Sequence, residues 1–288
     1  MKVTVHTLHA FAKSGSGGNP AGVVIGSDGL SEQQMLAVAK KVGFSETAFV
    51  QTSSNADYRV RFFTPVAEVD LCGHATIATF YLLANQGIVM PGEYTQETNA
   101  GVLRIEIMKD WTVLMDQNPP QYLEVLEKEQ VAESLNISPK IIRDDSPVQV
   151  VSTGLKDIFI PIDSIDSLMH IQPDMEKVRA LSRKHDVIGY HLFTYETKLG
   201  STAHCRNFAP LYDIDEEAAT GTSTGALSCY LFKYQKICGP MDNLTFEQGY
   251  SMERPSEILA KLETVGGEIT RVRVGGVAAN IEQMELNV

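Results

Sequence analysis

The chain has 288 residues, of which 43% are hydrophobic and 21% charged, and its formal net charge is -12. This length and composition exclude a disordered or fibrous chain and suggest two domains of ordinary size. An acidic protein repels phosphate backbones, so nucleic acid is not an expected partner.

Neither a membrane segment nor a secretory leader is expected. No apolar run reaches the ~18 residues that a membrane span requires. The first eight residues alternate apolar and polar side chains, as a strand does and a signal peptide does not. The cysteines Cys72, Cys205, Cys229 and Cys238 contain no C-x-x-C pair and are too sparse for a disulfide scaffold. We therefore expect free thiols in a reducing cytoplasm.

The first half of the chain alternates strand-like and helical segments. Ser31 is typical of a helix N-cap and Gly43 of a helix end, which predicts a helix over 32–42. A second, apolar helix is expected over 76–85, and the proline-containing stretch 116–121 predicts a linker. Residues rich in Val, Ile, Thr and aromatic side chains predict strands at 1–8, 21–25, 46–51, 58–63, 103–108 and 112–116.

The second half repeats this layout. It predicts a short helix over 127–135 and a long apolar helix over 224–234. Strands are expected at 148–152, 157–161, 189–194, 202–208, 268–274 and 279–286.

An internal repeat is the sharpest feature of the sequence. The pattern R-x-F-x-P occurs at 61–65 and again at 206–210. Each copy is followed, after eight or eleven residues, by a glycine that opens an apolar helix, Gly73 in the first half and Gly221 in the second. The ordered match predicts two copies of one β-rich unit wrapped around a helix. Two similar halves would form a cleft, which we expect to be the ligand site.

The starts of these two helices are candidate anion sites. A helix N-terminus offers unpaired N–H groups and a positive dipole end, which suit a carboxylate and an enolate-like transition state. The equally open alternative is that Thr76, Thr222 and Thr224 are caps and packing residues, because Ser and Thr commonly cap helices.

Glu46 and His74 are the candidate acid/base residues. A carboxylate between Phe44 and Phe49 would be partly desolvated, which suits a general base, although a solvated glutamate at a strand end is the common alternative. The helix start beside His74 would favour a neutral imidazole, although a lone histidine is more often a structural donor.

Other acidic and glycine-rich stretches are less informative. Glu68, Asp70, Glu216 and Glu217 could each supply a carboxylate to the cleft or simply be solvated. The histidines show no H-E-x-x-H pattern or paired cysteine spacing, so no metal site is predicted. The stretch 15–20 is a tight turn between strands rather than a phosphate loop, and it places Asn19 as a ligand contact.

Taken together, these motifs resemble the PhzF family of phenazine-biosynthesis isomerases, within the diaminopimelate-epimerase-like fold. The resemblance covers nearly the whole chain. It is carried by the sequence motifs at 18–20, 45–49, 61–76, 206–210, 219–221, 247–249, 254–256 and 274–276.

The resemblance implies an α+β fold of two pseudo-symmetric β-barrel-like domains, each wrapped around a central helix. The expected domains are 1–118 and 119–278, with 279–288 joining the first. The resemblance implies no metal and no organic cofactor. Members of the PhzF family often form homodimers, so a homodimer is possible here. The family's proton-transferring glutamate corresponds to Glu46 and its histidine to His74. The expected binding residues are Asn19, Asp70, Gly73, Ala75, Gly221, Thr222 and Ser223.

One departure from the family pattern falls at the second helix start. The family's usual Glu-Asp-Pro-Ala-Thr-Gly-Ser is replaced over 216–222, so that Glu217 stands for the aspartate and Ala218 for the proline. Glu217 keeps the carboxylate but reaches one methylene further. Related racemases and epimerases use two cysteines, and only Cys72 falls near such a position here, which argues against a two-thiol mechanism.

The leading hypothesis is therefore a cofactor-independent isomerase that shifts a proton within a small carboxylate substrate, with Glu46, His74 and Glu217 as catalytic residues. An amino-acid racemase or epimerase remains the enzymatic alternative. A small-molecule binding protein that keeps the fold without turnover is the other alternative.

Overall fold

The computed structural model describes residues 1–12, 15–237 and 239–288. The chain divides into two compact units. Unit 1 comprises Met1–Asp116 and Gly275–Val288, and unit 2 comprises Gln117–Val274. No helix in the described ranges is long and apolar enough to cross a membrane.

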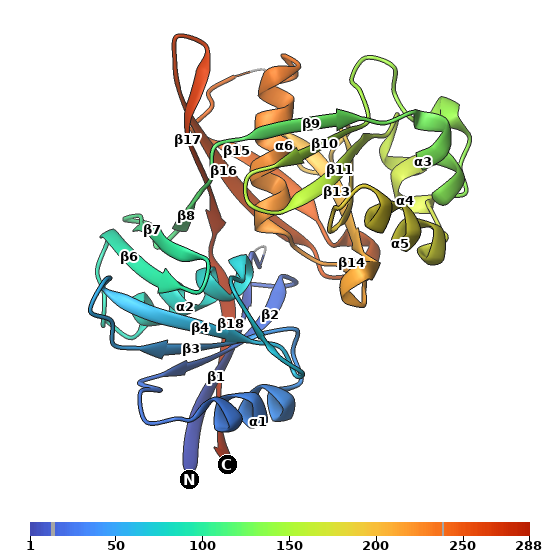
Figure 1. Ribbon diagram of the computed structural model, residues 1–288. Helices are drawn as coiled ribbons and strands as arrows, with labels where there is room; N and C mark the ends of the chain where they lie inside the picture. The colour runs from blue at the N-terminus through green and yellow to red at the C-terminus, as the bar shows by residue number, and fades with distance from the viewer. Residues whose placement is uncertain (13–14, 238) are drawn as a thin grey trace. The chain divides into compact units, whose positions relative to one another are not determined.

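Unit 1 is built from both ends of the chain. Strand β1 pairs antiparallel with β2 and with the C-terminal strand β18, which Figure 1 shows running beside it. β2 pairs parallel with β3, β3 antiparallel with β4, and β4 antiparallel with β5 and parallel with β6. β6, β7 and β8 continue as antiparallel neighbours. The bounds are β1 Lys2–Ala10, β2 Asn19–Ile25, α1 Glu32–Val42, β3 Thr47–Gln51, β4 Tyr58–Phe63, β5 Glu68–Val69, α2 Gly73–Asn85, β6 Gly92–Thr98, β7 Gly101–Ile107, β8 Val113–Gln117 and β18 Ala278–Asn287.

Unit 2 repeats this order of pairing. β10 pairs antiparallel with β11 and β9, β11 parallel with β12, and β12 antiparallel with β13. β13 then pairs antiparallel with β14 and parallel with β15, which pairs antiparallel with β16. The bounds are β9 Gln121–Val125, α3 Lys128–Ser134, β10 Gln149–Ser152, β11 Lys156–Pro161, α4 Ile165–His170, α5 Met175–Lys184, β12 Gly189–Thr194, β13 Ala203–Ala209, β14 Ile214–Glu217, α6 Gly221–Lys233, β15 Leu244–Gln248, β16 Ser256–Val265 and β17 Glu268–Gly276.

The repeated sequence motif builds the same ion pair in both units. Arg61 on β4 holds Glu68 through two hydrogen bonds of 2.7 and 2.6 Å, and Arg206 on β13 holds Glu216 at 2.8 and 2.9 Å. Each guanidinium also stacks on the phenylalanine two residues later in its motif. Bidentate pairs of this kind fix geometry as well as contributing energy. They tie the short strand before each apolar helix to the strand that carries the arginine.

The apolar helices α2 and α6 fill the interiors of their units. Ten of the thirteen residues of α2 are buried, and the helix packs against β1, β2, β3, β7 and β18. Ten of thirteen are also buried in α6, which packs against β10, β11 and β16. A helix that is apolar on all sides must be enclosed in this way. Closure of the strands into barrels remains a prediction.

Several predicted bounds need correction. The helices α2 and α6 begin three residues before the predicted positions, because the small residues at their first turns are helical and not part of the preceding loop. The predicted linker over 116–121 is shortened to 118–120, since Asp116 and Gln117 end β8 and Gln121 begins β9. The predicted cap at Ser31 is confirmed as a capping box, and Gly43 ends α1 in the left-handed conformation.

Candidate active site

Glu46 lies between the end of α1 and the start of β3. The left-handed Gly43 ends α1, and the Glu46 carbonyl accepts a hydrogen bond of 3.2 Å from the Gly22 N–H on β2. The next residue, Thr47, is fully buried. This anchoring sets the direction of the Glu46 side chain, which is 16% exposed. Its atom Oε2 is buried and accepts no hydrogen bond from the described residues.

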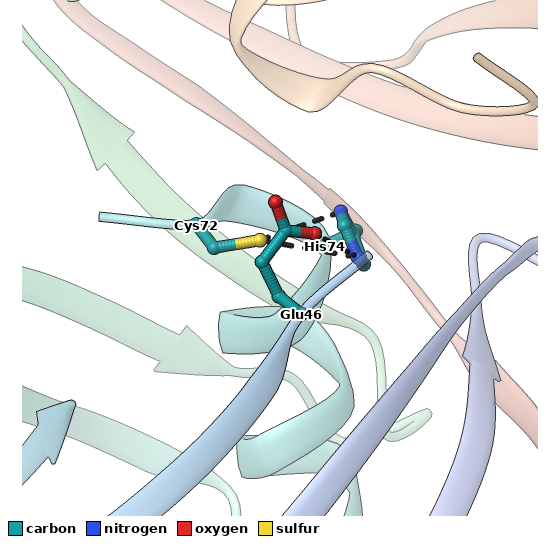
Figure 2. Close-up of side chains that lie close together, drawn as sticks. All are labelled: Glu46, Cys72 and His74. Carbon is teal, nitrogen blue, oxygen red and sulfur yellow. Dashed lines mark hydrogen bonds and ion pairs between the residues drawn. The ribbon is translucent and has the colours of Figure 1, made fainter. Parts of the chain in front are cut away.

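His74 meets this carboxylate from the first turn of α2. Its Nε2 lies 3.3 Å from Glu46 Oε2, and its Nδ1 lies 3.3 Å from Asn19 Nδ2 and 3.4 Å from Cys72 Sγ. Figure 2 shows the Glu46, Cys72 and His74 side chains pointing toward one another. The sequence predicted Glu46, His74 and Asn19 as site residues, and the structure brings these three together.

Burial governs the charge of the imidazole. The His74 side chain is 5% exposed, and this desolvation lowers its pKa below the ordinary value. The Glu46 carboxylate and a hydrogen bond to the Pro20 backbone act in the opposite direction but are outweighed. A neutral imidazole results near pH 7, as the sequence predicts, with burial as the main cause. A neutral ring can both accept and donate a proton.

The N-terminal ends of α2 and α6 carry no side-chain cap. The N-cap residues are Cys72 and Thr220, and neither side chain accepts a hydrogen bond from its helix. Thr76 and Thr224 instead turn inward and donate to the carbonyls of Cys72 and Thr220, at 2.8 and 2.9 Å. These hydrogen bonds to the preceding turn agree with the alternative that Thr76 and Thr224 are packing residues and do not bind a ligand. They leave the N–H groups of the first turns, including those of Gly73 and Ala75, without a capping oxygen from the cap residue.

Glu217 is held beside the start of α6. Its Oε2 accepts a 2.7 Å hydrogen bond from Thr220 Oγ1. The Gln248 side chain donates to the Glu217 carbonyl at 2.8 Å and accepts from the Thr220 N–H at 3.2 Å. The predicted catalytic glutamate thus belongs to a half-buried network at the helix entrance, next to Gly221 and Thr222.

Ser223 joins a buried network that the sequence did not reveal. Its hydroxyl donates to Asp157 Oδ2 at 2.5 Å, while Asn207 Nδ2 lies 3.5 Å from Ser223 Oγ and 3.1 Å from His191 Nδ1. Burial raises the pKa of Asp157 to about 6 and lowers that of His191 to about 3. Asp157, His191 and Asn207 come from three separate strands and Ser223 from α6, so the strand register and the position of the helix together form the network.

The remaining predicted residues lie outside these buried groups. Asp70 is exposed shortly before α2. Glu68 and Glu216, considered as ligand groups, are partners of Arg61 and Arg206.

Among the cysteines that the structure describes, Cys72 of unit 1 differs from the two of unit 2. Cys205 and Cys229 are buried thiols whose pKa values are raised by desolvation, which makes them poor nucleophiles. Cys238 lies outside the described residues. Cys72 is the thiol that lies against a histidine, and Glu46, Cys72 and His74 place one ligand atom each within 4.8 Å of one another. The sequence search for metal motifs missed this group because Glu46 is distant in the chain.

Sequence and structure comparisons agree on one family. The PhzC-PhzF family, described as phenazine biosynthesis-like protein, matches residues 8–284. An uncharacterized isomerase of Clostridium acetobutylicum is 32% identical and aligned over 99% of this chain and 98% of its own length. The trans-2,3-dihydro-3-hydroxyanthranilate isomerase of Pseudomonas fluorescens is 31% identical over 93% of this chain and 94% of its own.

A solved structure supports the same assignment. The Bacillus anthracis phenazine biosynthesis protein of the PhzF family superposes with a TM-score of 0.91 at 29% identity, covering all of both chains. The mixed α/β fold of this chain is therefore shared with that structure over its full length. The protein belongs to the PhzC-PhzF family and is an enzyme of the isomerase class.

Proposed function

We propose that the chain is a cofactor-independent isomerase that moves a proton between carbon atoms of a small carboxylate-bearing substrate, with Glu46 as the base. One observation carries the proposal. The Glu46 carboxylate is largely withdrawn from water, has one oxygen without a hydrogen bond, and lies 3.3 Å from a neutral imidazole. A general base needs an available oxygen of this kind within reach of the proton that it removes.

The proton balance requires no second substrate. Glu46 takes a proton from a substrate carbon, the electron pair delocalises as an enolate-like anion, and the Glu46 carboxyl group, whose proton can exchange with solvent, returns a proton to another carbon. The N–H groups at the start of α2 suit the developing negative charge, because a helix N-terminus favours anions. His74, held by Asn19, positions the substrate or relays the proton.

The substrate class is inferred from a relative. The Pseudomonas fluorescens protein is named for trans-2,3-dihydro-3-hydroxyanthranilate, a cyclic carboxylate. We propose a related small carboxylate here. Glu217 in place of the family's usual aspartate bears on substrate choice, because its carboxylate is already engaged by Thr220. Asp70, Gly221, Thr222 and Ser223 complete the proposed binding residues.

The proposal also includes closed barrels around α2 and α6, a homodimer, and a cytoplasmic location.

The test is solvent-deuterium incorporation. Purified protein is incubated in deuterated water with trans-2,3-dihydro-3-hydroxyanthranilate, and then with a panel of small carboxylates, and the products are read by mass spectrometry. Glu46→Gln is expected to reduce incorporation by about 10²–10⁴-fold, the usual contribution of a general base. Glu282→Gln, on the exposed part of β18, is the matched control and should exchange like the parent protein.

Two outcomes would contradict the proposal. Full exchange in Glu46→Gln would remove Glu46 from the mechanism. Exchange accompanied by inversion at one carbon, seen by chiral chromatography, would identify a racemase or epimerase in place of a positional isomerase.

A further inference from the structure

The cluster of Glu46, Cys72 and His74 combines a carboxylate, a thiol and an imidazole in one partly buried place. Their exposed fractions are 16%, 7% and 5%. These are the three side-chain types that bind zinc in proteins. We propose that the cluster is a site for Zn²⁺ or a similar thiophilic divalent cation, and that its occupancy blocks the enzyme.

The distances fit a tetrahedral ion. With the usual zinc bonds to sulfur, nitrogen and oxygen, a tetrahedron separates nitrogen from oxygen by about 3.3 Å and nitrogen from sulfur by about 3.6 Å. In the structure, His74 Nε2 lies 3.3 Å from Glu46 Oε2 and 3.9 Å from Cys72 Sγ. All three ligand atoms lie within 4.8 Å of one another. Small side-chain rotations therefore suffice to close the site, and the fourth position remains for water.

The charge balance also favours a divalent cation. Binding releases the thiol proton to solvent, so a thiolate and a carboxylate together neutralise the two positive charges. The N-terminal end of α2 repels a cation, because the helix dipole places about half a positive elementary charge there. The thiolate and the carboxylate each supply a full negative charge, which outweighs this repulsion. Glu46 Oε2 gains a partner that no described hydrogen bond now provides.

Ligand softness selects the metal. A single thiolate with an imidazole favours zinc, cobalt and copper over magnesium and calcium, which prefer sites made of oxygen atoms. Metal binding at Nε2 leaves the ring proton on Nδ1, where the Asn19 amide lies at 3.3 Å, so this amide must turn its oxygen toward the Nδ1–H to act as the outer partner of a metal-bound histidine.

Inhibition follows from the site and rests on the proposed function. An ion on Glu46 Oε2 uses the electron pair that would remove the substrate proton. Metal binding itself depends only on the three ligands. The decisive measurement is therefore made without substrate.

Co²⁺ is the probe, because a cobalt–thiolate bond gives a near-ultraviolet charge-transfer band and tetrahedral cobalt gives intense visible bands. Reduced protein titrated with Co²⁺ under nitrogen is expected to show both, and one equivalent of Zn²⁺ should remove them. Cys72→Ser should lose the near-ultraviolet band and bind Zn²⁺ more than about 100-fold more weakly, since loss of an outer partner alone costs 10–100-fold. Cys238→Ser controls for the thiol outside the described residues and should keep the band.

A second measurement covers the case in which a variant fails to fold. X-ray absorption of the parent protein with one equivalent of Zn²⁺ should give one sulfur neighbour at about 2.3 Å and nitrogen or oxygen neighbours at about 2.0–2.2 Å. A shell without sulfur, or a charge-transfer band that survives in Cys72→Ser, would overturn the site. If these spectra appear as expected but the metal-free parent protein shows no deuterium exchange, the proposed function alone is contradicted.

Discussion

The buried Asp157 allows a quantitative prediction of stability against pH. Its folded pKa is about 6, whereas its reference value is 3.8, because burial penalises the charged form more than the Ser223 and Gly189 hydrogen bonds favour it. A carboxyl group whose pKa is raised by folding binds more protons in the native state. Stability is then lost as the pH rises from the unfolded to the folded pKa.

The size of the effect follows from the shift. A difference of about two units corresponds to roughly 3 kcal/mol in total, and about 1.4 kcal/mol of it falls between pH 5 and pH 7.5. Asp157→Asn removes the titration while keeping an oxygen that can accept from Ser223. Relative to the parent protein, the variant should therefore gain about 1.4 kcal/mol in free energy of unfolding between pH 5 and pH 7.5.

The assay is urea unfolding, followed by circular dichroism at both pH values. His191 is the titratable side chain linked to this network through Asn207. Its folded pKa of about 3 lies below the ordinary value of 6.5, so His191 makes both proteins more stable as the pH rises from 5 to 7.5, and this contribution cancels from the difference between variant and parent. Asp242→Asn, at an exposed position of the same unit, is the control and should follow the parent protein. An Asp157→Asn variant whose stability difference from the parent is the same at both pH values would refute the reasoning.

Three further predictions concern stability and are read from urea unfolding. Gly249→Ala should lower the free energy of unfolding by about 1–3 kcal/mol, because Gly249 has φ of 79° and a Cβ there would clash with the Arg254 carbonyl oxygen. Gly26→Ala, with φ of 71° and open space around the position, is the control and should cost less; equal losses of stability would show that the clash is unimportant. Arg206→Met should lower the free energy of unfolding by about 3–5 kcal/mol, because it leaves the Glu216 carboxylate without its guanidinium partner. Arg61→Met should cost less, because the Arg61 site is more exposed; a larger loss at Arg61 would show that burial does not set the cost. Ser31→Ala should cost about 1 kcal/mol through loss of the capping box, and an unchanged midpoint would mean that α1 does not depend on its cap.

Local signals in the sequence predicted much of the fold. The strands β4 and β12 begin and end where the pattern of β-branched and aromatic residues predicts. The cap at Ser31 and the left-handed Gly43 are also confirmed, because both depend on neighbouring residues only. Helix α5 and strand β16 were not predicted. α5 is short and strongly charged, and β16 was hidden by the turn residues around it.

The candidate site was predictable only in part. Glu46 and His74 lie in recognisable motifs, and the expectation that they share a site agrees with the 3.3 Å distance between them. The part played by Cys72 was not predicted, because its contact with the imidazole depends on side-chain rotamers at the helix start. Asp157 and His191 gave no signal at all. Asp157 follows Lys156 at the start of β11 and His191 lies between apolar residues of β12, and their common network arises from the pairing of β11 with β12 and of β12 with β13.

The pairing of β1 with β18 has a consequence for the order in which the protein can fold during translation. Unit 1 carries Glu46 and His74, yet one of its strands is synthesised after every residue of unit 2. Unit 2 can complete its core on the ribosome, whereas the proposed proton-transfer site waits for residues 278–287 to emerge and close against β1. Nascent chains that stall before this strand would expose the edge of β1, the kind of unpaired edge on which chaperones and aggregation act.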